Sequence, residues 1–186
     1  APAWVVRIVL ALWCAALDAA PMGTSLPERA RLSEQQRAEV IDAIAQVLDT
    51  PAARSNPPDG DELGAAVVNL TGAWAGDPVT PSFGGSAPRW RQAIAAAAHR
   101  GVLAFGPDRA RRVTYVNPEV SVAPDAEVAV EWLIRRFLFA YGPATSRQYA
   151  RWLGVRPAWA AREFERCSGG LARVDEPGEA SFVLAG

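Results

Sequence analysis

The sequence predicts a mainly α-helical protein with small β-hairpins, in which three helices followed by a hairpin occur twice along the chain. Three observations predict this fold class. Apolar residues recur with the period of amphipathic helices, residues that favour helix starts and stops bracket these runs, and strand-like segments flank a turn near the end of each half. Three helices and a hairpin in this order form a winged helix, a helix-turn-helix motif with a β-wing. We therefore expect tandem winged-helix modules over residues 33–117 and 124–186, preceded by an N-terminal helix and linker over 1–32.

The first expected module begins at Ser33, which forms a capping box with Gln36 three residues later. A loop rich in Pro, Asn and Asp over 55–61 leads to a second helix, ELGAAVVNL, which ends near Gly72. The helix between the capping box and this loop, EQQRAEVIDAIAQVL, has an apolar face made of Val40, Ile41, Ile44, Val47 and Leu48.

The rest of this module is expected to contain one more helix and a hairpin. An irregular stretch, WAGDPVTPSFGGS, precedes a third helix from about Pro88 to Arg100, which Gly101 ends. VLAF and VTYV then flank the turn GPDRAR and predict the hairpin.

The second expected module begins at Asp125, which can cap a long apolar helix that runs to Tyr141. Gly142 tolerates a left-handed helix end, and Pro143 cannot continue the helix. Thr145 can accept a hydrogen bond from an amide of a new first turn. Two helices should therefore meet at a tight corner.

A third helix and a hairpin follow this corner. Gly154 ends the short helix over 146–153, and Pro157 suits the first turn of the next helix. LARVD and ASFVL flank a turn centred on Pro177-Gly178, which predicts a hairpin with a loop longer than two residues. The apolar face of the third helix, PAWAAREFERC, carries Ala160, Phe164 and Cys167.

The apolar N-terminal segment, WVVRIVLALWCAALDAA, could suggest a signal peptide or a membrane anchor. Arg7 and Asp18 interrupt it and leave only residues 8–17 uncharged, well short of the roughly 20 residues that span a bilayer. We expect a buried helix, no membrane association and a cytoplasmic location.

The composition excludes several kinds of functional site. The chain has 186 residues, enough for one large or two small cores, and half of them are apolar. Cys14 and Cys167 stand alone in apolar surroundings, and His99 is the one histidine. This histidine is more typical of a helix C-terminus or a packed side chain than of a general base. We therefore expect no metal, no cofactor and no hydrolytic triad.

Positive charge is concentrated in one part of the chain. Residues 1–88 carry five Arg against ten acidic residues, whereas residues 89–124 carry six Arg against two, a net charge of +4. The third helix and the hairpin of the first module contain these arginines, and a winged helix usually lays those two elements on DNA. The six are Arg89, Arg91, Arg100, Arg109, Arg111 and Arg112. Arg147, Arg151 and Arg162 lie on the last two helices of the second module.

These nine arginines are the candidate contacts to double-stranded DNA, through guanidinium groups on phosphates. Spacing places Arg89 and Arg100 on one helical face. From the charges alone, a solvated helix face and an ordinary charged turn are slightly favoured over contact with DNA. The segment FGPDRARR is more specific, because a turn tip with three Arg around one Asp has few structural uses. Trp90, Trp132, Trp152 and Trp159 are expected in the core rather than as platforms for base stacking.

Several long segments resemble a known family. LSEQQRAEVIDAIAQVL, DELGAAVVNLTGAWAGD, APRWRQAIAAAAHRGVLAFGPDRARRVTY and RRFLFAYGPATSRQYARWLG are similar to actinobacterial winged-helix DNA-binding proteins related to the AlkZ/YcaQ-type DNA glycosylases. The resemblance covers residues 9–186. It implies tandem winged helices around duplex DNA, association with the nucleoid and a part in DNA repair, since the glycosylases of this family remove alkylated or crosslinked bases.

The chain departs from that family at its catalytic motif. The motif, Gln-x-Gln or Gln-x-Asp, has no counterpart, because Gln35 and Gln36 are adjacent while Gln46, Gln92 and Gln148 are isolated. The resemblance therefore supplies no catalytic residue and implies a portion of a longer protein, truncated at both ends. Three hypotheses stay open: duplex DNA binding within a repair protein, glycosylase activity with a different catalytic group, and a module that binds other proteins.

Overall fold

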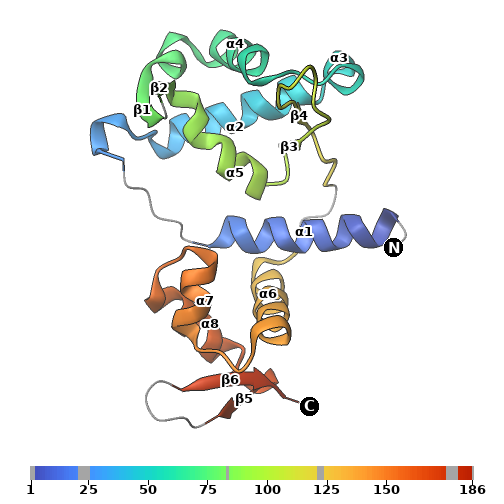
Figure 1. Ribbon diagram of the computed structural model, residues 1–186, viewed down its shortest axis with the longest axis vertical. Coiled ribbons are helices and arrows are strands. Elements are labelled where there is room, and N and C mark those ends of the chain that lie inside the picture. Colours follow the sequence, from blue (N-terminus) through green and yellow to red (C-terminus); the bar gives the residue numbers. More distant parts are fainter. Residues whose placement is uncertain (1–2, 21–25, 83, 121–123, 175–179, 186) are drawn as a thin grey trace. The chain divides into compact units, whose positions relative to one another are not determined.

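The computed structural model describes residues 3–20, 26–82, 84–120, 124–174 and 180–185, with side chains from residue 9 on. The chain divides into two compact units (Figure 1). We call residues 25–121 the central unit, and residues 1–24 together with 122–186 the terminal unit. The N-terminal helix thus belongs to the same unit as the last third of the chain. The protein is mainly helical with small antiparallel hairpins, as the sequence predicts.

The central unit contains two longer helices, several short ones and two hairpins (Figure 1). Its α-helices are α2 (Glu34–Leu48), α3 (Pro51–Ser55), α4 (Gly60–Thr71) and α5 (Ile94–His99), and its 3-10 helices are η1 (Glu28–Ala30), η2 (Ala73–Gly76) and η3 (Arg89–Ala93). Its strands are β1 (Pro78–Ser82), β2 (Gly85–Pro88), β3 (Ala104–Phe105) and β4 (Tyr115–Val116), which pair as β1–β2 and β3–β4.

Side-chain caps define where the two longer helices start. Ser33 caps α2 in the predicted capping box with Gln36. Asp59, which the sequence analysis assigned to a loop, caps α4 in a second capping box with Glu62. The apolar faces of these helices meet in a core that includes Val40, Ile41, Ile44, Leu48, Leu63, Val67 and Trp90.

Two expectations about the central unit are wrong. The segment before the third helix is not irregular, because β1 and β2 form an antiparallel hairpin in which Thr80 pairs with Ala87. The third helix is not continuous either: it begins as the 3-10 helix η3 and becomes α-helical only at Ile94. A 3-10 helix has three residues per turn, so Arg89 and Arg100 do not share one regular helical face.

The segment before α4 pairs with the second strand of the β3–β4 hairpin. Asp59 forms an isolated antiparallel bridge with Thr114. The amide of Tyr115 donates to the carbonyl of Pro58 at 2.9 Å. The hairpin is thereby attached to the start of the second long helix of the unit.

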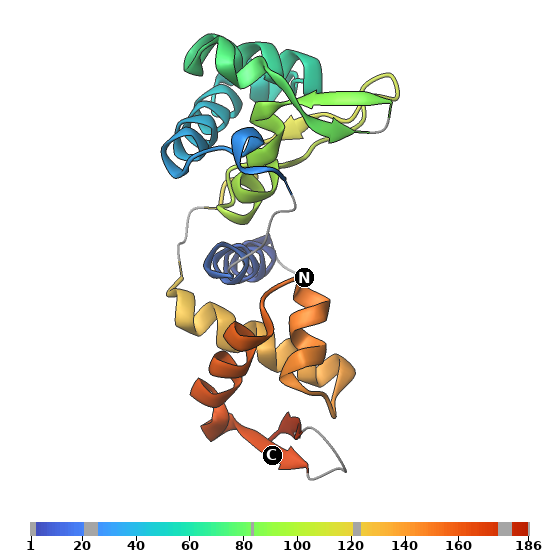
Figure 2. The ribbon, with the colours of Figure 1, turned by 90° about the vertical axis from the view of Figure 1, so that its left-hand side faces the viewer.

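The terminal unit packs α1 (Ala3–Ala19) against α6 (Ala126–Tyr141) (Figure 2). Both helices contribute apolar side chains to one core. Two shorter helices, α7 (Ser146–Leu153) and α8 (Pro157–Arg166), and the 3-10 helix η4 (Ser168–Gly170) lead to the strands β5 (Leu171–Val174) and β6 (Ser181–Leu184). The predicted turn centred on Pro177-Gly178 lies outside the described residues. No helix in the described part of the chain is long and apolar enough to cross a membrane.

The corner between α6 and α7 forms where the sequence predicts it, but by a different geometry. Gly142 has φ −72° and ψ 154°, so its backbone is extended and not left-handed. A Cβ atom on Gly142 would lie 2.5 Å from the carbonyl oxygen of Leu138, which explains the glycine. Thr145 then caps α7 in a capping box with Gln148. The predicted cap is confirmed, and the predicted left-handed end is wrong.

One residue of this corner also pairs with the C-terminal hairpin. Between Gly142 and Thr145, the backbone of Ala144 pairs with Phe182 of β6. The amide of Ala144 donates to the carbonyl of Phe182 at 3.1 Å, and the amide of Phe182 donates back at 2.9 Å. The helix ends before Gly142, and Ala144 pairs with the hairpin before α7 begins.

Candidate nucleic-acid interface

The β3–β4 hairpin ends in a tight turn that carries three of the candidate arginines. The amide of Arg109 donates to the carbonyl of Arg112 at 2.9 Å, and the amide of Arg112 donates back at 2.9 Å. The two residues between them have positive φ, 50° at Ala110 and 68° at Arg111. Two central residues with positive φ define a type I′ turn, which suits the twist of a hairpin.

The two arginines that flank this turn are engaged with acidic residues at the start of α4. Nη1 of Arg112 donates to Oδ2 of Asp59 at 2.9 Å and to Oδ2 of Asp61 at 3.2 Å. Nη2 of Arg109 pairs with Glu62 and lies 3.6 Å from Oδ2 of Asp59. We call Asp59, Asp61 and Glu62 the carboxylate cluster.

Asp59 is the centre of this cluster. Its side chain is buried, and its Oδ1 accepts hydrogen bonds from the amides of Asp61 and Glu62, both at 3.0 Å. The Glu62 amide and the guanidinium of Arg112 lower the pKa of Asp59 to about 2. The hydrogen bond from the Asp59 amide, followed by that from Arg109, lowers the pKa of Glu62. Asp59 and Glu62 are therefore held in the charged form that pairs with the arginines.

The expectation that this arginine-rich turn has few structural uses is wrong for Arg109 and Arg112, because both attach the hairpin to α4. The sequence signal that was missed is the capping box of Asp59 and Glu62, which places acidic side chains at a helix start. Arg111 is exposed, as Arg112 is, but unlike Arg109 and Arg112 it has no ion-pair partner among the described residues.

The other three arginines of the positive block occupy three different environments. Arg89 is bound within the unit, since it lies 3.5 Å from Oδ2 of Asp77 and its Nη1 donates to the carbonyl of Ala30 at 3.1 Å. Arg91 is exposed, with Cζ 5.8 Å from the centre of the Trp90 ring. Arg100 is exposed at the end of α5.

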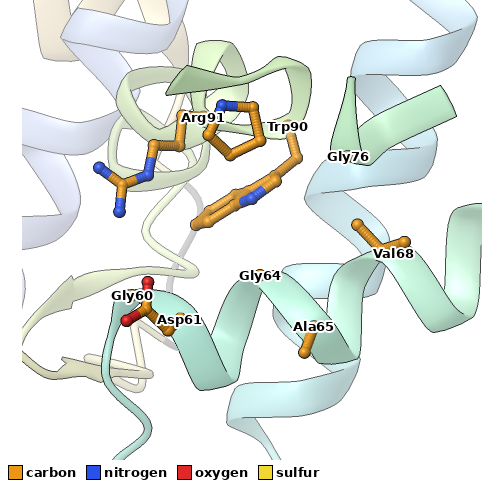
Figure 3. Close-up of a pocket in the computed structure, with 9 residues that line it drawn as sticks. Gly60, Asp61, Gly64, Ala65, Val68, Gly76, Trp90 and Arg91 are labelled. Carbon is orange, nitrogen blue, oxygen red and sulfur yellow. The ribbon is translucent and has the colours of Figure 1, made fainter. Parts of the chain in front are cut away.

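Arg91 lies at one end of a surface pocket of about 310 Å³ (Figure 3). Its guanidinium points toward Gly60 and Asp61, whereas Trp90 forms the middle of the lining (Figure 3). Trp90 is only 2% exposed and packs directly on α4, because Gly64 has no side chain between them. Trp90 is therefore a core residue, as expected, and the ionisable lining of the pocket is limited to Asp61 and Arg91 among the described residues.

The terminal unit presents its candidate arginines on α7 and α8. Arg147 and Arg151 are four residues apart on α7, so they share one face, and both are exposed. Arg162 is exposed on α8. Arg156, which the sequence analysis did not select, is exposed at the start of α8. Exposed guanidinium groups on these two helices suit contact with phosphates.

Of the three tryptophans of the terminal unit that the sequence places in the core, two are packed and one is partly exposed. Trp132 and Trp159 are partly buried against the core. Trp152 is 40% exposed and contacts the rings of Phe137, Tyr149, Tyr141 and Trp13, with centroids 5.2 to 6.3 Å apart. The expectation of a buried core position holds for most of these tryptophans but is too strong for Trp152.

Three of the glutamines have structural roles. Gln36 and Gln148 complete capping boxes. Gln92 donates to the carbonyl of Ala30 at 2.8 Å and to Oγ1 of Thr80 at 3.1 Å. These contacts hold the three side chains in place within the fold.

The described residues offer few other catalytic or metal-binding groups. No group of three or more His, Cys, Asp or Glu side chains suited to a metal ion occurs in the part of the chain that the structure describes. Cys14 and Cys167 are buried, and burial raises the pKa of both thiols. Neither thiol is therefore a reactive nucleophile.

Comparisons with known proteins agree on one family. The model of the family described as DNA glycosylase AlkZ-like matches residues 2–186. The interstrand DNA cross-link repair glycosylase of Streptomyces sahachiroi is 31% identical over 104 residues, which is 51% of this chain and 28% of that protein. The solved structure of Streptomyces sahachiroi DNA glycosylase AlkZ matches 96% of this chain with a TM-score of 0.68 at 23% identity. At that identity the likeness supports the fold. The chain spans about half of the solved protein, 48% of its length.

Proposed function

Because the chain belongs to the AlkZ-like DNA glycosylase family, we propose that it binds duplex DNA through two winged helices, as part of a DNA-repair protein of the glycosylase type. The named relative repairs interstrand cross-links, and we extend to this chain the broader role of binding damaged duplexes. Binding would be directed mainly at the phosphate backbone and would depend little on base sequence.

One observation carries the winged-helix assignment: both units attach their hairpin to the chain in the same way. In the terminal unit, Ala144 precedes the second helix of the three and pairs with Phe182 of the hairpin. In the central unit, Asp59 precedes the second long helix and pairs with Thr114 of the hairpin. The same connection in two units of unrelated sequence supports one shared plan, with the hairpin as the wing.

The proposed contacts are the exposed arginines that form no ion pair with the carboxylate cluster. Six of the nine candidates meet this description: Arg91, Arg100, Arg111, Arg147, Arg151 and Arg162. Arg89, Arg109 and Arg112 instead contact acidic groups of the central unit. Since the chain has a net charge of −1, we expect weak binding, in the range of about 10⁻⁴ to 10⁻⁶ M typical of non-specific binding at physiological salt.

A direct binding experiment tests this proposal. Labelled duplexes of two unrelated sequences are titrated with the whole chain, and fluorescence anisotropy is followed at several salt concentrations. We expect similar affinities for both duplexes and a linear fall of log K with log salt. Absence of saturable binding at low salt would overturn the proposal and would favour a module that binds other proteins.

A further inference from the structure

The tip of the β3–β4 hairpin has an arginine in a backbone conformation that is unfavourable for this residue type. Arg111 has φ 68° and follows Ala110, which has φ 50°. Residues with a Cβ atom rarely adopt this left-handed conformation, and Asn or Gly strongly predominates in type I′ turns. Arg111 therefore lowers the stability of the turn. Such strain persists where the surrounding structure enforces it, and it is concentrated at functional positions.

The surrounding structure enforces this conformation from both sides of the turn. On one side, Arg112 donates to Asp59 at 2.9 Å. On the other side, Arg109 pairs with Glu62 and donates to Oδ1 of Asn56, in the loop before α4, at 3.0 Å. Both ends of the turn are thereby fixed to the start of α4. Arg111 lies between these two anchors and extends no side-chain contact to the carboxylate cluster.

We propose that Arg111 is the phosphate-contacting residue of this hairpin, and that Arg109 and Arg112 are positioning residues that hold it against the DNA backbone. This inference rests on the proposed duplex-binding function. It assigns the hairpin one phosphate contact, whereas the sequence predicts three. Arg109 and Arg112 would have to leave their carboxylates to reach phosphates, but Arg111 can reach them as it stands.

Replacement of Arg111 tests the contact through two effects of opposite sign. Arg111→Gly removes the guanidinium and relieves the left-handed backbone, so the melting temperature should rise by a few degrees while duplex binding weakens. The slope of log K against log salt should become shallower by about 0.9, the value for one phosphate contact. Arg111→Asn, which also tolerates this conformation, should behave similarly.

Replacement of Asp59 tests the positioning role. Asp59→Asn keeps the oxygen that caps α4, because Asn caps helices as well as Asp, but it replaces one of the two carboxylate partners of Arg112 with an amide. If Arg109 and Arg112 position Arg111, the Asp59→Asn chain binds duplex DNA more weakly than a control with the same change in charge. Asp108→Asn provides this control, because Asp108 is exposed on the same hairpin. If Arg109 and Arg112 contact phosphates themselves, Asp59→Asn leaves Arg112 with the exposed Asp61 as its carboxylate partner, so this chain binds more tightly than the control.

The outcomes separate this inference from the function on which it rests. Absence of duplex binding by the wild-type chain overturns both. Binding by the wild type with an unchanged salt slope in Arg111→Gly overturns the contact by Arg111 alone. Binding by Asp59→Asn that equals or exceeds that of Asp108→Asn overturns the positioning role. A shallower slope in Arg111→Gly together with weaker binding by Asp59→Asn supports the whole inference.

Discussion

The carboxylate of Asp59 connects a helix start to a hairpin tip: Oδ1 caps α4, and Oδ2 accepts a hydrogen bond from Arg112 at 2.9 Å. These two residues are far apart in the sequence, yet their contact decides which arginines of the hairpin are engaged within the unit. The connection also explains why the net charge of +4 over residues 89–124 overstates the positive surface of the central unit. Acidic residues from the preceding part of the chain neutralise much of that charge.

The stability of the chain should depend on pH through Asp59. The pKa of Asp59 is about 2 in the folded protein and about 3.9 in an unfolded chain. The contribution of Asp59 is therefore complete above about pH 4 and is lost as the pH falls toward 2. Urea unfolding between pH 2 and 6 should show wild type losing stability relative to Asp59→Asn over this window. A difference between the two proteins that does not change with pH would contradict this assignment.

Gly64→Ala should destabilise the central unit. A Cβ atom at this position would lie 2.9 Å from Nε1 of Trp90, whose ring is held in the core and cannot move aside. Alanine favours a helix over glycine by about 1 kcal/mol, but overpacking a core costs about 1–3 kcal/mol. We expect a net loss of about 1 kcal/mol in urea unfolding followed by tryptophan fluorescence.

A second glycine of α4 provides the control for this prediction. In Gly60→Ala the closest contact of the new Cβ is the end of the exposed Arg91 side chain, which can shift. This variant should keep nearly wild-type stability. A Gly64→Ala chain as stable as Gly60→Ala would show that the packing of Trp90 on α4 is looser than we describe.

The chain by itself should not release 7-methylguanine from methylated duplex DNA. The Gln-x-Gln or Gln-x-Asp motif that the resemblance implies for this step has no counterpart in the sequence, and Gln36, Gln92 and Gln148 have structural contacts. Release is measured by chromatography of the free base, with an active alkylpurine glycosylase as the positive control. Release above the level without protein would support the hypothesis of a working enzyme with another catalytic group.

The sequence predicts local features well where one residue type has one physical role. Thr145 and Ser33 cap helices as predicted, and Gly142-Pro143 ends α6. The β1–β2 hairpin was missed because Pro78 and Pro81 are unusual in strands. The pairing of Arg112 with Asp59 could not be predicted, because it depends on the tertiary contact between a hairpin and a distant helix start.

The central claim is that exposed arginines of both units bind duplex DNA through phosphates, and the salt dependence of binding tests it most directly. The test variant replaces Arg111, Arg151 and Arg162 with Gln in one chain. Three lost contacts at about 0.9 each should make the slope of log K against log salt shallower by up to about 2.7.

A control variant neutralises three arginines that pair with carboxylates. Arg54 pairs with Asp49, Arg135 with Glu131, and Arg166 with Glu163. It has the same net charge as the test variant, so long-range attraction to DNA is matched. The measurement is an anisotropy titration of one duplex at several salt concentrations for wild type, test variant and control. The account predicts a shallower slope for the test variant and a slope close to wild type for the control. Equal slopes for all three proteins would contradict it.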